Sequence, residues 1–199
     1  MSLSSKPEFP PLIAPHSDRP RLESMTAIDV RRRFAGDFPL STTRTNILLG
    51  LMEVIAILDE VRIEGALWID GSFVTKKIDP SDVDIVLQLK AEFVYGCSPV
   101  QQQVLSWFAH DDLKEDFRCH SFVVIEYPEG HYLHASGEQQ RIEWLDWFGT
   151  SRSGDPKGIG VIQLPSNKGW KLFQSSRRNQ VNTPSRPLSL RPASTAWQR

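Results

Sequence analysis

The chain has 199 residues, of which 40% are hydrophobic, and a formal net charge of −1 at pH 7. This length and composition fit one folded domain with a substantial core and some appendages. No apolar run approaches twenty residues and the first residues contain no signal-peptide core, which argues against a transmembrane helix and predicts a cytoplasmic protein with no membrane partner. The two cysteines, Cys97 and Cys119, are compatible with a reducing compartment.

Charge is unevenly distributed along the chain. Residues 165–199 contain seven of the 23 Lys and Arg residues and none of the 24 Asp and Glu residues. After Phe173 the composition turns to Ser, Pro, Asn, Gln and Arg, which predicts a disordered basic tail over 174–199. Such a tail either contacts RNA or DNA through phosphates without sequence preference or serves as a solvated tether.

The N-terminal part predicts an arm followed by a helix. Residues 1–25 are rich in Pro and Ser and show no hydrophobic periodicity, so we expect an irregular arm that wraps over the domain. Thr26 and Asp29 have the spacing of a capping box and predict a short helix through Phe34. The arginine run 31–33 in this helix forms either a phosphate or nucleic-acid patch or a solvated helix face.

A longer helix and two strands follow. Ser41-Thr42-Thr43 is expected to cap a helix that reaches about Val61, in which apolar residues recur at the three- and four-residue spacing of a helix packed on a sheet. Residues 66–69 then predict a buried strand, Gly71-Ser72 its exit turn, and 83–89 a second strand.

The remaining elements alternate between helix and strand. They are a helix from Pro99, a helical turn over 111–117, a strand over 119–127, a helix over 136–148 opened by a capping box at Ser136, and a strand over 159–164. The fold class that this order predicts is α/β (α+β), a small mixed sheet with helices packed on one side. We expect this domain to span 26–173.

Two aspartates and a glycine-serine turn carry the chemistry of the sequence. Asp82 and Asp84 lie two residues apart in a predicted strand, so their carboxylates project from the same face. Two like charges so close repel each other unless a cation lies between them. The Gly71-Ser72 turn offers backbone N–H groups and a hydroxyl that suit a phosphate. The sequence therefore predicts a site for a metal ion and a phosphate.

These residues also carry a family resemblance. Gly71-Ser72 followed by Asp82-Val83-Asp84-Ile85 resembles the signature of the polymerase-β-like nucleotidyltransferase superfamily, and the order helix, strand, turn, strand matches its catalytic core. More narrowly, the chain through Lys157-Gly158 is similar to a group of small prokaryotic proteins with a DGSF…D-x-D core and a late KG loop. These proteins occur among mobile and defence-associated genes.

The resemblance implies a reaction and its setting. A nucleoside monophosphate would pass from a nucleoside triphosphate to a protein, RNA or small-molecule hydroxyl, and pyrophosphate would leave. The setting it implies is a toxin–antitoxin or phage-defence system, with a cognate toxin or antitoxin as partner. The alternative is a catalytically inactive nucleotidyltransferase-like antitoxin or regulatory module.

The resemblance also assigns roles to residues. Asp82 and Asp84 would be catalytic and hold one or two Mg²⁺ (or Mn²⁺) ions, which lower the pKa of the attacking hydroxyl. Gly71 and Ser72 would hold the β- and γ-phosphates. Lys76 or its neighbour Lys77 would add charge near phosphate, or be a solvated loop lysine.

Two residues of a later loop have the same two interpretations. Lys157 could reach the triphosphate as a point charge or lie in water as a turn lysine. Arg152 has a similar but weaker claim to the phosphate.

The third carboxylate of the family is expected on the strand over 119–126. By alternation, Glu126 shares a strand face with His120, and we predict Glu126 as the third catalytic carboxylate. Asp116, which precedes the strand, is the competing acid. His120 is a further candidate, as a metal ligand or a base. Without a carboxylate at this place, activation of the acceptor hydroxyl would be weakened, which would favour the inactive alternative.

Three further features admit a structural and a functional interpretation. Asp70 is expected to cap the Gly71 turn rather than to bind metal. His131 and His134 form either a zinc pair or ordinary loop residues, and the loop favours the latter. The aromatic residues of 144–148 belong to the core or an interface, or one of them stacks on a base.

Overall fold

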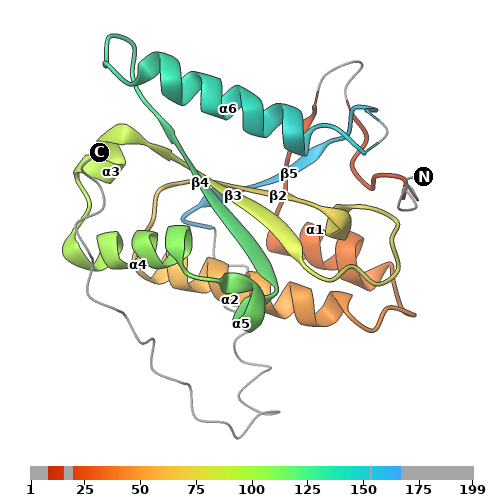
Figure 1. Ribbon diagram of the computed structural model, residues 1–199. Coiled ribbons are helices and arrows are strands. Elements are labelled where there is room, and N and C mark those ends of the chain that lie inside the picture. Colours follow the sequence, from red (N-terminus) through yellow and green to blue (C-terminus); the bar gives the residue numbers. More distant parts are fainter. Residues whose placement is uncertain (1–8, 16–19, 153, 167–199) are drawn as a thin grey trace, which may run out of the picture.

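A five-stranded mixed sheet forms the centre of the molecule (Figure 1). The computed structural model describes residues 9–15, 20–152 and 154–166, so the predicted tail over 174–199 lies outside the described residues. The strand order is β1-β5-β2-β3-β4. The strands are β1 (Leu22–Ser24), β2 (Gly65–Asp70), β3 (Val83–Lys90), β4 (Cys119–Glu126) and β5 (Ile159–Leu164).

Helices fill most of the connections between these strands. They are α1 (Ala27–Arg31) with its π-helical continuation η1 (Arg32–Gly36), α2 (Arg44–Glu60), α3 (Ala91–Tyr95), α4 (Pro99–His110), α5 (Leu113–Phe117) and α6 (His134–Phe148), besides a 3₁₀ turn η2 (Ser72–Val74). The predicted α/β (α+β) class with a mixed sheet is confirmed. Among the described residues no helix is long and apolar enough to cross a bilayer.

Helices cover both faces of the sheet, which corrects the prediction of helices on one side. In Figure 1, α6 lies on one face and α1, α2, α4 and α5 lie on the other. The reason is that β2 and β3 are apolar on both faces. Leu67 and Ile69 belong to the larger core with α2, whereas Trp68 packs with Phe148 and with Trp144 of α6.

The strand register aligns three polar residues at one end of the sheet. β2 and β3 are antiparallel, with Asp70 opposite Asp84. β3 and β4 are parallel, with Asp84 opposite His120. Residues directly opposite each other share a face, and these three follow the alternation of the residues under α6. The row Asp70, Asp84, His120 therefore lies on the α6 face.

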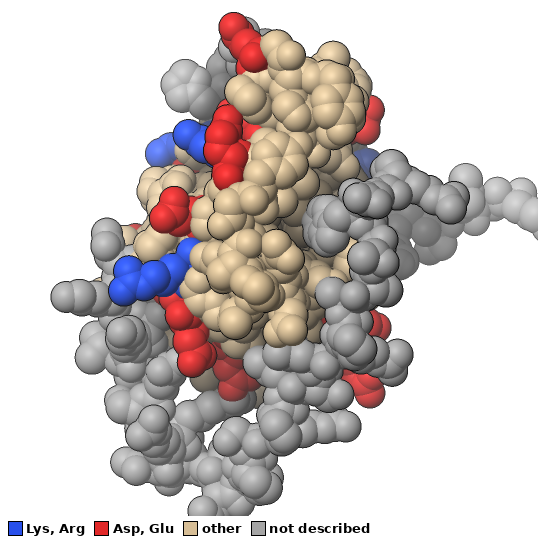
Figure 2. All heavy atoms as spheres, turned by 90° about the vertical axis from the view of Figure 1, so that its left-hand side faces the viewer, with Lys and Arg blue, Asp and Glu red and all other residues tan. Residues whose placement is uncertain are grey.

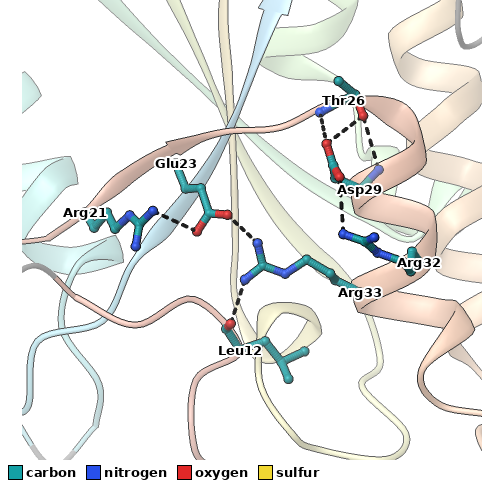
Figure 3. Close-up of polar contacts among 7 residues, drawn as sticks. All are labelled: Leu12, Arg21, Glu23, Thr26, Asp29, Arg32 and Arg33. Atoms are coloured by element: carbon teal, nitrogen blue, oxygen red, sulfur yellow. Dashed lines mark hydrogen bonds and ion pairs between the residues drawn. The ribbon is translucent and has the colours of Figure 1, made fainter.

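The N-terminal arm is more regular than the sequence predicts. Residues 22–24 form strand β1, which pairs in parallel with β5 and completes one edge of the sheet, and Ile13 is fully buried. Arg33 joins the parts of the arm, because it contacts the carboxylate of Glu23 and donates to the carbonyl oxygen of Leu12 at 2.8 Å (Figure 3). The prediction of an irregular arm therefore fails for this segment.

The capping box at the start of α1 is confirmed. Thr26 Oγ1 accepts from the backbone N–H of Asp29 at 3.2 Å, and the Asp29 carboxylate accepts from the N–H of Thr26 at 3.0 Å (Figure 3). The same carboxylate lies 3.5 Å from the Arg32 guanidinium. Arg32 and Arg33 thus contact acids of their own chain, which favours the structural interpretation of the arginine run.

Helix α6 begins before the capping box that the sequence predicts. Its first residue is His134, its N-cap is Leu133, and Ser136 lies within the first turn. The N–H of Gly137 already donates to the Leu133 carbonyl oxygen at 2.8 Å. Gly137, in this first part of the helix, packs closely against the ring of Tyr127.

The end of the molecule that carries α3 and the turn before α6 has few charged side chains at its centre. Figure 2 shows mainly residues other than Lys, Arg, Asp and Glu there, bordered mainly by Asp and Glu in the described part of the chain. His131 stacks on Tyr127 with centroids 4.8 Å apart, its Nε2 lies 3.2 Å from the Tyr95 hydroxyl, and His134 Nδ1 lies 2.8 Å from a backbone carbonyl oxygen. These contacts give both histidines structural roles. His131 lies in the turn as predicted, whereas His134 is the first residue of α6 rather than a loop residue.

Candidate active site

Strand β2 ends in a turn that only glycine can make. Gly71 has φ +81° and ψ −163°, a region of backbone space that is essentially restricted to glycine. A Cβ at this position would lie 2.2 Å from Oδ2 of Asp84. The predicted Gly71-Ser72 turn therefore lies in direct contact with one of the two predicted metal-binding carboxylates.

A buried arginine holds the loop that follows this turn. Arg44 is 0% exposed, and its guanidinium donates to the carbonyl oxygens of Phe73 at 2.7 Å and of Thr75 and Lys77 at 2.6 Å each. The ring of Phe38 lies 3.7 Å from the guanidinium carbon. Arg44 thus fixes the course of the chain just after Ser72.

The pKa of Arg44 reflects its burial. Removal from water lowers the pKa to about 10, and the nearby negative charge of Asp79 opposes the shift. The group remains a cation at neutral pH. This role could not be predicted from sequence, because an arginine in the first turn of a helix normally points to solvent.

Each carboxylate of the site contacts one basic side chain. Lys157 Nζ lies 2.8 Å from Asp70 Oδ2, Lys114 Nζ 2.5 Å from Asp82 Oδ2, and His120 Nδ1 3.3 Å from Asp84 Oδ1. Five elements or their flanks supply these residues: β2, β3, β4, α5 and the segment before β5. The site is consequently a mixed array of acids and bases rather than an acidic cluster.

The three carboxyl groups have different acidities. Burial raises the pKa of Asp70 to about 7, although the charge of Lys157 opposes the shift. Burial and the charge of Asp82 raise the pKa of Asp84, against the effect of His120. Burial also acts to raise the pKa of Asp82, but hydrogen bonds from Lys114 and Ser81 outweigh it and the net shift is downward. Asp82 is the carboxylate most firmly ionised.

These residues line one cavity of about 670 Å³. Its polar side includes Asp70, Gly71, Ser72, Asp82, Asp84 and His120, its basic residues are Lys77, Arg152 and Lys157, and its aromatic residues are Phe9, Phe122, Trp147 and Phe148. The volume is in the range of small-molecule sites. The cavity combines a polar, charged side with an aromatic one.

Three predicted site residues, Glu126, Lys76 and Asp116, do not line this cavity. Glu126 is opposite Lys90 in the strand register, six residues and therefore about 20 Å along β4 from His120, and its carboxylate accepts from the amide of Gln88 at 3.2 Å. His120 is the β4 residue beside Asp84. The prediction of Glu126 as the third carboxylate does not agree with this register.

Lys76 and Asp116 also lie elsewhere. Lys76 borders a separate, mainly apolar hollow of about 420 Å³ with Leu12 and Ile78, whereas its neighbour Lys77 lines the candidate site. Asp116 belongs to α5 and does not line the cavity. Of the predicted phosphate-binding lysines, Lys157 and Lys77 are the two that reach it.

The carboxylates fit a metal ion that arrives with a phosphate ligand. Within the described ranges, no group of three or more His, Cys, Asp and Glu side chains is arranged to hold a metal. Asp82 precedes the first residue of β3, Val83, so the prediction that both aspartates lie within one strand is wrong for Asp82, but Asp82 and Asp84 both line the cavity. Mg²⁺ is commonly held by one or two carboxylates, several waters and substrate phosphates, so two acids beside the Gly71 turn suffice.

The fold and site define a class: an α/β domain whose glycine-serine turn and Asp-x-Asp strand share a polar cavity. The chain belongs to the family of unknown function DUF6932, whose model matches residues 10–163. No curated protein and no solved structure matches the chain. The matched range includes every acidic and basic residue of the cavity.

Proposed function

We propose that this protein is a Mg²⁺-dependent nucleotidyltransferase, which moves a nucleoside monophosphate from a nucleoside triphosphate to a hydroxyl of a protein, an RNA or a small molecule. The observation that carries the proposal is the contact between the Gly71 turn and the Asp84 carboxylate. It brings phosphate-binding backbone groups and metal-binding oxygens to the same wall of one cavity.

Each part of the cavity has a role in this reaction. Asp82 and Asp84 hold Mg²⁺ (or Mn²⁺), which neutralises triphosphate charge and lowers the pKa of the acceptor hydroxyl. The Ser72 hydroxyl and the backbone at Gly71 bind the β- and γ-phosphates. Lys157, which lies 2.8 Å from Asp70, supplies positive charge from the neighbouring loop.

The reaction forms one bond and breaks another. The acceptor hydroxyl releases its proton to solvent and its oxygen bonds to the α-phosphorus, while the bond from the α-phosphorus to the bridging oxygen breaks and pyrophosphate leaves. His120, 3.3 Å from Asp84 Oδ1, orients this carboxylate where the superfamily has a third acid.

A nucleotide substrate and two free buried thiols, Cys97 and Cys119, agree with a cytoplasmic location.

Label transfer tests the proposal directly. The wild-type protein is incubated with each of the four α-labelled nucleoside triphosphates, Mg²⁺ and a bacterial lysate, in parallel with Asp82→Asn, Asp84→Asn and the control Glu126→Gln. We expect at least one nucleotide to label an acceptor, the two Asp variants to lose about 100-fold or more, and the control to retain activity. If the wild type and both Asp variants give equal label, the protein does not have the proposed nucleotidyltransferase activity.

A second candidate is an inactive nucleotidyltransferase-like antitoxin or regulatory module. The observation in its favour is that each of the three carboxylates already contacts a basic side chain. Its test is capture of a cognate toxin by the tagged protein, followed by neutralisation assays. Neutralisation that survives the Asp82→Asn/Asp84→Asn double substitution supports the module, and its loss supports catalysis.

A further inference from the structure

Phe122 and Trp147 line one side of the cavity, and Trp144 packs against both of them from behind. We call these three residues, Phe122, Trp144 and Trp147, the aromatic wall. The indoles of Trp144 and Trp147 are stacked, with centroids 5.1 Å apart and planes 20° apart. Phe122 lies 4.4 Å from Trp144 and 6.2 Å from Trp147. The wall joins β4 to the last turns of α6.

Trp147 is the exposed member of this wall. It is 65% exposed and lines the cavity, whereas Trp144 is half-buried and contacts the buried ring of Phe148 edge-on at 5.4 Å. The packing behind Trp144 fixes the orientation of the stacked pair. A rigid indole whose surface remains largely in water is suited to accept another flat ring, because stacking then buries apolar area at a low cost in side-chain entropy.

The wall and the phosphate-binding turn lie on opposite sides of Asp84. The Gly71 turn belongs to β2, which pairs with β3 on one side of Asp84. Phe122 belongs to β4, which pairs with β3 on the other side, and its ring lies 4.3 Å from that of His120. A ligand with its triphosphate on the turn and a metal at Asp84 would extend toward α6.

We propose that Trp147 is the surface on which the nucleobase of the substrate stacks. This assignment rests on the proposed function, because it takes the ligand of the cavity to be a nucleoside triphosphate. Stacking uses the π-face that every base has and does not read the base edge. The site therefore accepts more than one nucleotide, with purines preferred for their larger ring area.

Binding measurements on the full chain test this assignment with two probes. One is an ATP analogue whose α- and β-phosphorus atoms are joined by a methylene group, and the other is inorganic tripolyphosphate, which has no base. Both are titrated with Mg²⁺ by calorimetry into the wild type, Trp147→Ala, Trp147→Phe and the control Tyr132→Ala. Tyr132 is the control for loss of an exposed aromatic side chain, because it is 85% exposed but does not line the cavity.

The expected result is a selective loss. Trp147→Ala weakens binding of the ATP analogue by about 5- to 150-fold and leaves the affinity for tripolyphosphate unchanged. Trp147→Phe recovers part of the affinity for the analogue. Tyr132→Ala changes neither. Equal weakening of both probes, or no change with the analogue, overturns the stacking role while the proposed function stands. A wild type that binds neither probe overturns both proposals.

Discussion

The carboxylate of Asp84 touches the backbone of Gly71, so closely that a methyl group on Gly71 would lie 2.2 Å from Oδ2. The antiparallel strands β2 and β3 are thus in contact here through the Asp84 carboxylate and the glycine that follows β2. The contact makes the identity of residue 71 and the position of Asp84 depend on each other.

Gly71→Ala is expected to lower stability and to abolish nucleotide binding. Gly130→Ala is a matched control, because Gly130 also has a positive φ, +84°, but has no atom within 4 Å of an added Cβ. Backbone strain alone amounts to about 1–2 kcal/mol, so the control should lose about that much. We expect Gly71→Ala to lose about 2 kcal/mol more in urea unfolding. Equal losses would show that Asp84 adds no constraint.

Arg44→Lys is expected to loosen the loop after Ser72. A lysine ammonium cannot reproduce the planar fork that reaches the carbonyl oxygens of Phe73, Thr75 and Lys77, and buried carbonyls without partners are costly. We expect a loss of about 3 kcal/mol in urea unfolding and faster amide exchange over 72–78. The control Arg32→Lys, at an exposed side chain, should change stability by less than about 0.5 kcal/mol.

The Asp70–Lys157 pair predicts a pH dependence of stability. Because burial raises the pKa of Asp70 to about 7, the folded state binds the proton more tightly than the unfolded state. The contribution of Asp70 to stability is therefore fully present below pH 4 and falls as the pH rises to about 7, at up to about 1.4 kcal/mol per pH unit.

Comparison with Asp70→Asn isolates this contribution. The free energy of unfolding of the wild type, minus that of the variant, should decrease between pH 4 and pH 7 and then level off. Urea unfolding at half-unit pH intervals measures the difference. A difference that rises with pH would mean that Lys157 outweighs burial and that the pKa of Asp70 lies below its ordinary value.

If Asp82 binds a metal ion as we propose, Lys114 would compete with that ion for its carboxylate. Its ammonium lies 2.5 Å from Asp82 Oδ2, but the side chain is 52% exposed, so its removal should change stability by less than about 1 kcal/mol. We expect Lys114→Met to tighten Mn²⁺ binding several-fold in the presence of the methylene-bridged ATP analogue, and Asp82→Asn to weaken it. Electron paramagnetic resonance of free Mn²⁺ measures both. Weaker binding by Lys114→Met would indicate that Lys114 binds phosphate instead.

The parts of the site that could be predicted from sequence are those encoded locally. Gly71-Ser72 and Asp82 with Asp84 each lie within one short segment, so the strand period and turn chemistry suffice to locate them. The partner on β4 could not be found this way. Alternation selects a face with several candidates, and only the register of β3 with β4 selects His120 over Glu126.

The rest of the fold shows the same division. The buried run Leu67–Ile69 is apolar on both faces of β2, which is a sequence signal for helices on both sides of the sheet. Arg44 and Lys114 leave no such signal. The loop carbonyls that Arg44 contacts lie 29–34 residues away along the chain. Asp82 lies 32 residues from Lys114, so only the tertiary structure brings these groups together.

The position of β5 has a consequence for biosynthesis. This last described strand is inserted between β1 and β2, and the segment just before it carries Lys157 to Asp70. A chain still being translated before Ile159 has emerged exposes the facing edges of β1 and β2 and lacks one wall of the cavity. The cavity can therefore form, and any reaction in it can begin, only after β5 has been synthesised.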